Sequence, residues 1–172
     1  MSRGFSLIEV MFAMAVLVVG LLGGITVIAV ATANDGRSKL HSTAILLAQS
    51  TMETIAAIPT AAGNTQTTLT DCAGTPHTIE TAVPAAGGGP ALIDTGAFAG
   101  SIDFSQPTIA NYSMVYVTCS SGGNVGFDVR WRIDPGPTPA TQLVTVSVKP
   151  LVTAGATQFM LPYTLHQLRG NF

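Results

Sequence analysis

Charge is scarce in this chain. Of 172 residues, only 9% are Asp, Glu, Lys or Arg, whereas soluble domains carry about 25%. The formal net charge is -2, so no strong field favours nucleic acid or an anionic lipid surface as a partner. Part of the deficit is one long apolar run near the N-terminus, and the rest reflects a body rich in Thr, Ser, Ala and Gly.

Signatures of catalysis and of cofactor binding are also missing. The three histidines, His41, His77 and His166, form no H-E-x-x-H pattern, and the sequence has no C-x-x-C, G-x-S-x-G, Walker or dinucleotide motif. Asp71 and Cys72 lie near His77, but a zinc site needs more ligands. The run "AAGGGP" lacks the lysine and the helix of a phosphate loop. We therefore expect neither an enzyme, nor a cofactor, nor a metal site.

Cysteine is limited to Cys72 and Cys119, both beyond the apolar run. An even cysteine count in an exported chain favours one disulfide in an oxidising compartment. In the chain-entropy model such a loop stabilises the fold by roughly 4 kcal/mol. The alternative is a pair of buried thiols.

The apolar run extends from Phe5 to Ala33, and its only ionisable residue is Glu9. As a helix it would be about 43 Å long, more than the roughly 30 Å of a bilayer core. It could be a plain membrane anchor, or a secretory signal peptide cleaved after Ala31 or Ala33. Its length is about twice that of a usual signal-peptide core, and an acidic residue inside a membrane segment usually has a function and a partner.

A third identity explains both the length of the apolar run and the acidic residue within it. Met1-Ser2-Arg3 is followed by Gly4 and then by "FSLIEV", and "GFSLIEV" closely resembles the processing motif of type IV prepilins. The resemblance implies that residues 1–4 are a leader, that prepilin peptidase cuts between Gly4 and Phe5, and that it methylates the new N-terminal amine. Residues 5–33 are then retained as the transmembrane and assembly half of a long helix. The resemblance also places the N-terminus in the cytoplasm, which the charges flanking the segment do not decide.

The resemblance gives Glu9 a role. Glu9 lies one helical turn after Phe5, and a carboxylate in an apolar packed environment needs a charged partner. In the family, this glutamate is thought to pair with the N-terminal amine of a neighbouring subunit and so to set the axial register. The alternative is that Glu9 only reaches toward the lipid headgroups.

A second stretch, residues 34–58, has the pattern of an amphipathic helix. Apolar residues recur at steps of three and four, at Leu40, Ala44, Leu47, Ala48, Met52 and Ile55. Pro59 disfavours helix in the preceding residue, so we expect one helix from Phe5 to about Ala57 whose second half packs on the protein's own sheet. Glycines at 20, 23, 24 and 36 could allow close approach of neighbouring helices, a bend, or a break; the sequence does not choose.

The body, residues 59–172, is expected to be rich in β-structure. Residues 60–71 look polar and turn-like, and 82–90 look like a loop. Alternating patterns predict strands in 112–119, 124–134, 141–149 and 157–168, and Pro162 makes the last one an edge or interrupted strand. Short links favour an antiparallel meander. In 124–134, Phe127 and Trp131 face one way, while the face with Arg130 and Arg132 reads as a solvated mixed surface. The predicted class is α+β and pilin-like, with about four antiparallel strands.

Finer resemblances point to minor pilins of the PilV kind. They are "GLLGG" at 20–24, "LLAQSTMETI" at 46–55 and a tryptophan-bearing strand at 129–131. They imply a structural subunit that helps to prime a type IV pilus. Its partners would be other minor pilins, major pilin subunits, the peptidase, inner-membrane lipid and the inner-membrane assembly platform. It would have a periplasmic body and a place in the filament or at its tip. The alternatives are a type II secretion pseudopilin and a Sec-exported soluble β-domain that acts as a binding module.

Overall fold

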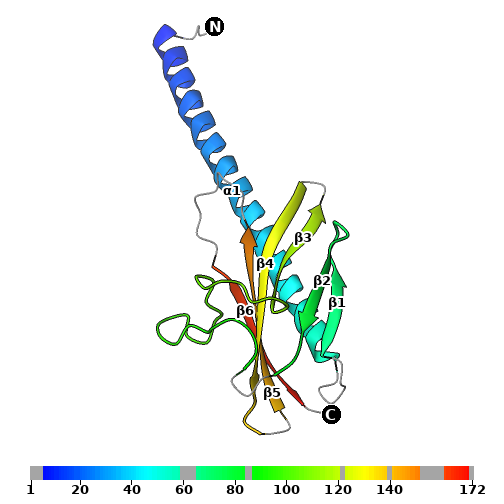
Figure 1. Ribbon diagram of the computed structural model, residues 1–172. Helices are drawn as coiled ribbons and strands as arrows, with labels where there is room; N and C mark the ends of the chain where they lie inside the picture. Colours follow the sequence, from blue (N-terminus) through cyan, green and yellow to red (C-terminus); the bar gives the residue numbers. More distant parts are fainter. Residues whose placement is uncertain are drawn as a thin grey trace. The chain divides into compact units, whose positions relative to one another are not determined.

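The computed structural model describes residues 6–58, 65–83, 87–120, 123–138, 141–151 and 161–170. Along the chain the elements are α1 (Leu7–Ala56), β1 (Gln66–Thr70), β2 (Pro76–Glu80), β3 (Ser113–Ser120), β4 (Gly123–Pro135), β5 (Thr141–Leu151) and β6 (Tyr163–Gly170) (Figure 1). They fall into two compact units, residues 1–40 and residues 41–172. The predicted α+β class, with a long N-terminal helix and four antiparallel strands, is confirmed.

The first unit is the apolar part of α1. Every large apolar side chain described from Leu7 to Val30 is between 46% and 80% exposed. The helix continues without a break through its four glycines, and a Cβ added at any of them would meet nothing within 4 Å. The expected start at Phe5 lies outside the described residues, and the helix ends one residue before the expected Ala57.

The second unit is built on one antiparallel sheet with strand order β3-β4-β5-β6. Each strand pairs with the next along the chain, as short links predict. Val129 is opposite Val148 and Trp131 is opposite Val146, so the apolar residues of neighbouring strands line up on one face. That face is the core, with side chains exposed by 1% or less at Phe127, Val129, Trp131, Ile133, Val144, Val146 and Val148.

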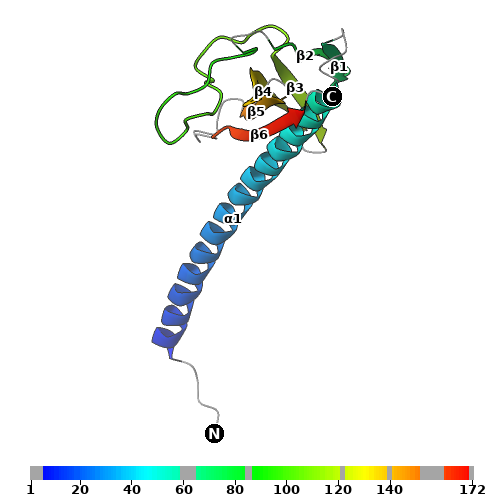
Figure 2. The ribbon, with the colours of Figure 1, turned by 90° about the horizontal axis from the view of Figure 1, so that it is seen from below.

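The second half of α1 covers this face. Its stripe is buried, with exposed fractions of 6% or less at Ala44, Leu47, Ala48, Met52 and Ile55. The ring of His41 contacts the ring of Tyr163 at a centroid distance of 5.6 Å, which places the start of this half beside β6. Figures 1 and 2 both show residues 41–56 crossing the sheet. Helix and sheet therefore form a two-layer core.

Arg169 closes the far end of this core. It is only 6% exposed, and its guanidinium donates to Gln142 Oε1 at 2.6 Å, to the Ile55 carbonyl at 2.8 Å and to the Thr81 carbonyl at 3.2 Å. The Ile55 carbonyl belongs to the last turn of α1, where carbonyls lack helical donors and the dipole favours a cation. One side chain of β6 thus holds the end of the helix and the segment after β2.

One expectation was wrong: residues 60–71 are not all turn. β1 and β2 form an antiparallel hairpin in which Thr67 is opposite Ile79. Ile79 is fully buried, so the hairpin contributes to the core. The strand was missed because "QTTLT" carries a single large apolar residue and β2 opens with Pro76, which normally demotes a strand.

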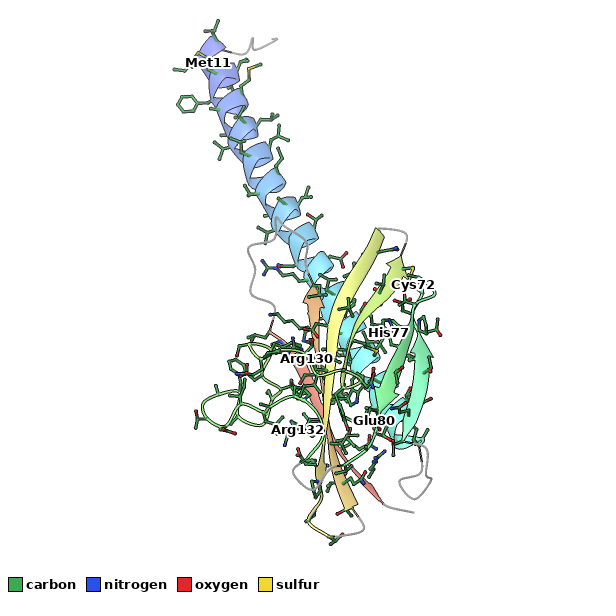
Figure 3. All side chains as sticks on the ribbon, viewed as in Figure 1. Met11, Cys72, His77, Glu80, Arg130 and Arg132 are labelled. Carbon is green, nitrogen blue, oxygen red and sulfur yellow. A yellow bond between two sulfur atoms is a disulfide. The ribbon has the colours of Figure 1, made fainter. Side chains whose placement is uncertain are left out.

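The second correction concerns the other face of the sheet, which is covered rather than solvated. Arg130 is 6% exposed, pairs with Asp128 at 2.9 Å and donates to the Gln106 carbonyl at 2.8 Å. Phe104 lies over its guanidinium, 4.7 Å from the ring centroid. Figure 3 shows Arg130 and Arg132 on β4 beside the segment 87–112, which supplies this cover. Because a segment distant in sequence does the covering, strand periodicity could not reveal it.

The glycine run in this segment serves a close approach. Gly88 exchanges both backbone hydrogen bonds with Ile133, each at 2.8 Å. A Cβ at Gly89 would fall against the Trp131 carbonyl, and Gly89 also has a φ of +115°. Only glycine fits that position without strain. The segment therefore continues the pairing of β4 past Arg130, which is the partner of the first residue of β3.

Candidate processing and assembly site

The predicted processing site adjoins the start of α1. Gly4 and Phe5 lie outside the described residues, and Ser6 is the first residue that the structure describes. The Ser6 carbonyl accepts hydrogen bonds from the Glu9 amide at 3.0 Å and the Val10 amide at 3.3 Å. Ser6 therefore immediately precedes the helix and Glu9 is its third residue. This Ser-x-x-Glu spacing is typical of a capping box. The spacing is visible in the sequence, but it was not among the predicted features.

Glu9 is exposed on a helix face that is otherwise apolar. Ala13 and Leu17 follow it at steps of four, and together with Val10 and Met14 these residues line a shallow groove along the helix. Among residues 6–58, no basic side chain forms an ion pair with Glu9. A carboxylate in such surroundings is suited to bind an ammonium group supplied from elsewhere.

The helix around Glu9 is apolar and exposed. By length and composition α1 can cross a membrane: its most apolar window has a mean hydropathy of 2.6, and none of that window is buried. Apolar side chains such as Met11 project from the helix (Figure 3), and those described from Leu7 to Val30 are all exposed. A helix that is apolar all round is normally covered by protein or by a bilayer.

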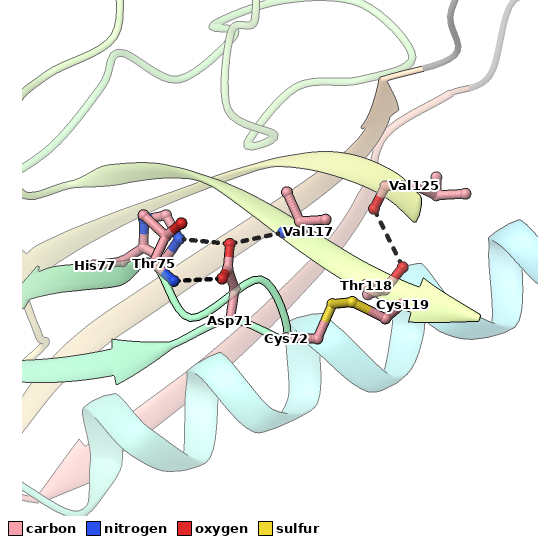
Figure 4. The surroundings of a disulfide bond; sticks show 8 residues. All are labelled: Asp71, Cys72, Thr75, His77, Val117, Thr118, Cys119 and Val125. Carbon is pink, nitrogen blue, oxygen red and sulfur yellow. Dashed lines mark hydrogen bonds and ion pairs between the residues drawn. A yellow bond between two sulfur atoms is a disulfide. The ribbon is translucent and has the colours of Figure 1, made fainter. Parts of the chain in front are cut away.

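The cysteines lie in the second unit, where the structure joins Cys72 to Cys119 with a Cα–Cα distance of 5.8 Å. Cys72 follows β1 in the turn of the hairpin, and Cys119 is near the end of β3 (Figure 4). The Cys72 amide also donates to the Val117 carbonyl at 3.4 Å. The disulfide therefore ties the hairpin to the β3 edge of the sheet.

Asp71 reinforces this tie. Its carboxylate accepts hydrogen bonds from the Thr75 amide at 2.8 Å, from His77 Nε2 at 3.2 Å and from the Val117 amide at 3.4 Å (Figure 4). Burial opposes its ionisation, but the hydrogen bonds from Thr75, His77 and Val117 outweigh burial and lower the pKa of Asp71. Asp71 is thus a structural anion that holds the hairpin turn.

The remaining histidines also make structural contacts. His41 packs on Tyr163, and His166 Nδ1 hydrogen-bonds the Thr145 hydroxyl at 3.0 Å. Cys72 is in a disulfide, so it is not a thiolate ligand beside Asp71 and His77. Within the described ranges, no three His, Cys, Asp or Glu side chains form a group that could hold a metal ion.

Comparison with known proteins finds a match at the N-terminal end of the chain. Residues 1–25 match the prokaryotic N-terminal methylation motif. No curated protein and no solved structure gave a significant match. The matched segment contains Gly4, Phe5 and Glu9, and it continues into the membrane-compatible part of α1. The motif and the helix that carries it indicate a type IV pilin-like or pseudopilin-like protein, a structural subunit rather than an enzyme.

Proposed function

We propose that this protein is a minor pilin of the PilV kind that takes part in the initiation of type IV pilus assembly. The observation that carries the proposal is the methylation motif at residues 1–25, followed by an exposed apolar helix. Residues 1–4 are the leader, 5–33 the membrane and assembly half of the helix, 34–58 the amphipathic half, and 59–172 the periplasmic body. The short sequence resemblances at 20–24, 46–55 and 129–131 support the PilV kind.

In this proposal, prepilin peptidase cleaves between Gly4 and Phe5 and methylates the Phe5 amine. Glu9 then pairs with that amine in a neighbouring subunit, either another minor pilin or a major pilin. A subunit displaced along the axis leaves a charge unpaired among apolar helices, which costs several kcal/mol. The exposed side chains of residues 7–30 supply packing area for the other helices, and the inner membrane holds the processed subunit until the assembly platform extracts it.

The N-terminus of the mature protein tests the first step. Mass spectrometry of the mature chain should find methylated Phe5 as its first residue. Gly4→Ser should block cleavage, so that the full-length chain accumulates with lower electrophoretic mobility. A mature chain that begins near Thr32 or Asn34 would refute the proposal in favour of a secreted soluble domain.

Two substitutions separate the charge of Glu9 from its place in the capping box. Glu9→Gln keeps a side chain that suits the third helical position but removes the charge, whereas Glu9→Ala removes both. Both variants should be processed and inserted, yet neither should support filament assembly in a strain without a substitute pilin. Normal piliation with Glu9→Gln would show that the charge does not set register.

A type II secretion pseudopilin fits the same motif. Deletion of the gene for this protein in its host distinguishes a pilin from a pseudopilin. Loss of surface pili with normal export of secreted proteins supports the pilin, and the reverse result supports the pseudopilin.

A further inference from the structure

The second unit has two open strand edges at its opposite ends. Within the described part of the chain, β6 pairs only with β5, and β1 pairs only with β2. The hairpin lies beside β3, because the Cys72 amide donates to Val117 and the Glu80 amide donates to Asn111. The lateral order is therefore β1, β2, β3, β4, β5, β6, with β1 and β6 outermost (Figure 1).

The two outer strands run in opposite directions. Residues 72 and 80 contact residues 117 and 111 respectively, so β2 is antiparallel to β3 and β1 is parallel to β3. Each strand from β3 to β6 is antiparallel to the one before it, so β6 opposes β3 and therefore β1. A second copy placed alongside in the same orientation presents β1 antiparallel to β6. Processed pilin-like subunits share one orientation because all cross the same membrane.

Neither β1 nor β6 contains a lysine, a proline or a bulge. Edge strands are usually protected by lysine, by proline within the strand or by a bulge. β1 has no ionisable side chain, and the only permanent charge on β6, Arg169, is turned into the core. Leu168 on β6 is 57% exposed. Like charges therefore do not oppose contact between the two edges.

A groove lies between α1 and β6. It has a volume of about 330 Å³ and is lined by Gln49, Met52 and Glu53 of α1 and by Leu165, His166 and Gln167 of β6. On β1, Thr67 shares the face of buried Ile79, and Leu69 follows two positions later on the same face. In a neighbouring copy these two side chains face this groove. Leu69 meets the apolar wall, while the Thr67 hydroxyl can donate to the one acid, Glu53.

We infer that a second copy of this chain docks its β1 edge onto the β6 edge, so that the sheets of neighbouring subunits become continuous. The inference rests on the proposed function for the common orientation of the copies. A five-residue strand buries well under the roughly 1,000 Å² that a stable interface needs. The contact therefore forms only where the apolar helices already hold subunits together and raise their effective concentration.

Pairing of β6 with β6 does not satisfy the same condition. Two copies with antiparallel β6 strands are related by a two-fold axis that also reverses residues 41–56. Such copies would not share the single orientation that the proposed function requires. The β1–β6 contact is heterologous, and such contacts can repeat from copy to copy.

Cysteine cross-linking of the full chain in membranes tests this inference. Thr68→Cys is combined in turn with Thr164→Cys, His166→Cys and Leu168→Cys, whose side chains lie on the face away from α1, like that of Thr68. Positions on alternate residues are about 7 Å apart, so one of the three pairs should fit disulfide geometry best. The matched control is Thr68→Cys with Gln167→Cys, because Gln167 lies on the opposite face of β6.

After mild oxidation, one of the three pairs should give a ladder of dimers and larger products. That product should exceed the control by about ten-fold, given the strict geometry of disulfides. When the two cysteines of that pair are placed in separate copies and the copies are mixed, the products should stop at dimers. Absence of the ladder, equal yield from the control, or dimers of Leu168→Cys alone would each overturn the inference. The mass of the mature N-terminus, read in the same sample, shows separately whether processing at Gly4 took place.

Discussion

Replacement of Arg169 by methionine tests how the helix is held to the sheet. The change keeps an unbranched apolar stem but removes all three donors. The Ile55 and Thr81 carbonyls, which are buried, and Gln142 Oε1, which is partly buried, then lose the hydrogen bonds that Arg169 donates. A hydrogen bond to a charged group contributes about 1.5–3 kcal/mol. Burial of the guanidinium, which lowers its pKa, offsets part of the sum.

We expect a net loss of about 3 kcal/mol, which is a large part of the 5–15 kcal/mol that holds a typical domain folded. Trp131 is the single tryptophan and is fully buried, so its fluorescence reports unfolding of the second unit. In urea titrations of the full chain in detergent, the midpoint should fall by about 1–3 M, since a small domain loses about 1–3 kcal/mol of stability per molar urea.

Two variants separate the loss of these hydrogen bonds from the general effect of an Arg→Met change and from the loss of charge. Arg37→Met makes the same change on an exposed part of α1 and should alter the free energy of unfolding by less than about 0.5 kcal/mol. Arg169→Lys retains the charge but cannot reach three acceptors with a planar fork, so it should recover only about 1 kcal/mol. If Arg169→Met and Arg37→Met shift the midpoint equally, then Arg169 does not hold the helix end.

The same fluorescence titration checks two further predictions. Cys72→Ser with Cys119→Ser opens a loop with a sequence separation of 47 and should cost about 4 kcal/mol by chain entropy; a loss below about 1 kcal/mol would contradict it. The pKa of Asp71 is lowered in the fold, so its contribution to stability is present above the unfolded pKa of about 3.9 and is lost as pH falls through the folded pKa. Asp71→Asn should therefore destabilise the protein at pH 6, and its difference from wild type should shrink toward pH 2; a constant difference would refute this.

The spacing of apolar residues predicted the helix and the strands whose own apolar faces form the core. The stripe from Leu40 to Ile55 and the alternation from Phe127 to Ile133 each place one apolar face toward the other, and a two-layer core follows. The hairpin could not be read in the same way. Only Leu69 and Ile79 give it an apolar face, and its stability comes from pairing and from the tie to β3.

The covered outer face of β4 shows a second limit. Arg130 and Asp128 alternate with core residues, which normally indicates solvent. The structure instead buries Arg130 beneath Phe104 and the Gln106 carbonyl, contacts made by a segment more than twenty residues away. At the candidate site the reverse holds, because the motif around Gly4 and Glu9 is local and is readable from sequence alone.

The contact between Arg169 and Ile55 joins residues 114 positions apart. During synthesis the helix emerges first, and the strand that secures its end emerges long afterwards. Until then, the apolar stripe at Ala44, Ala48 and Met52 lacks part of its cover, and such exposed apolar surface is prone to aggregation. The end of α1 can therefore be secured only after β6 has been synthesised.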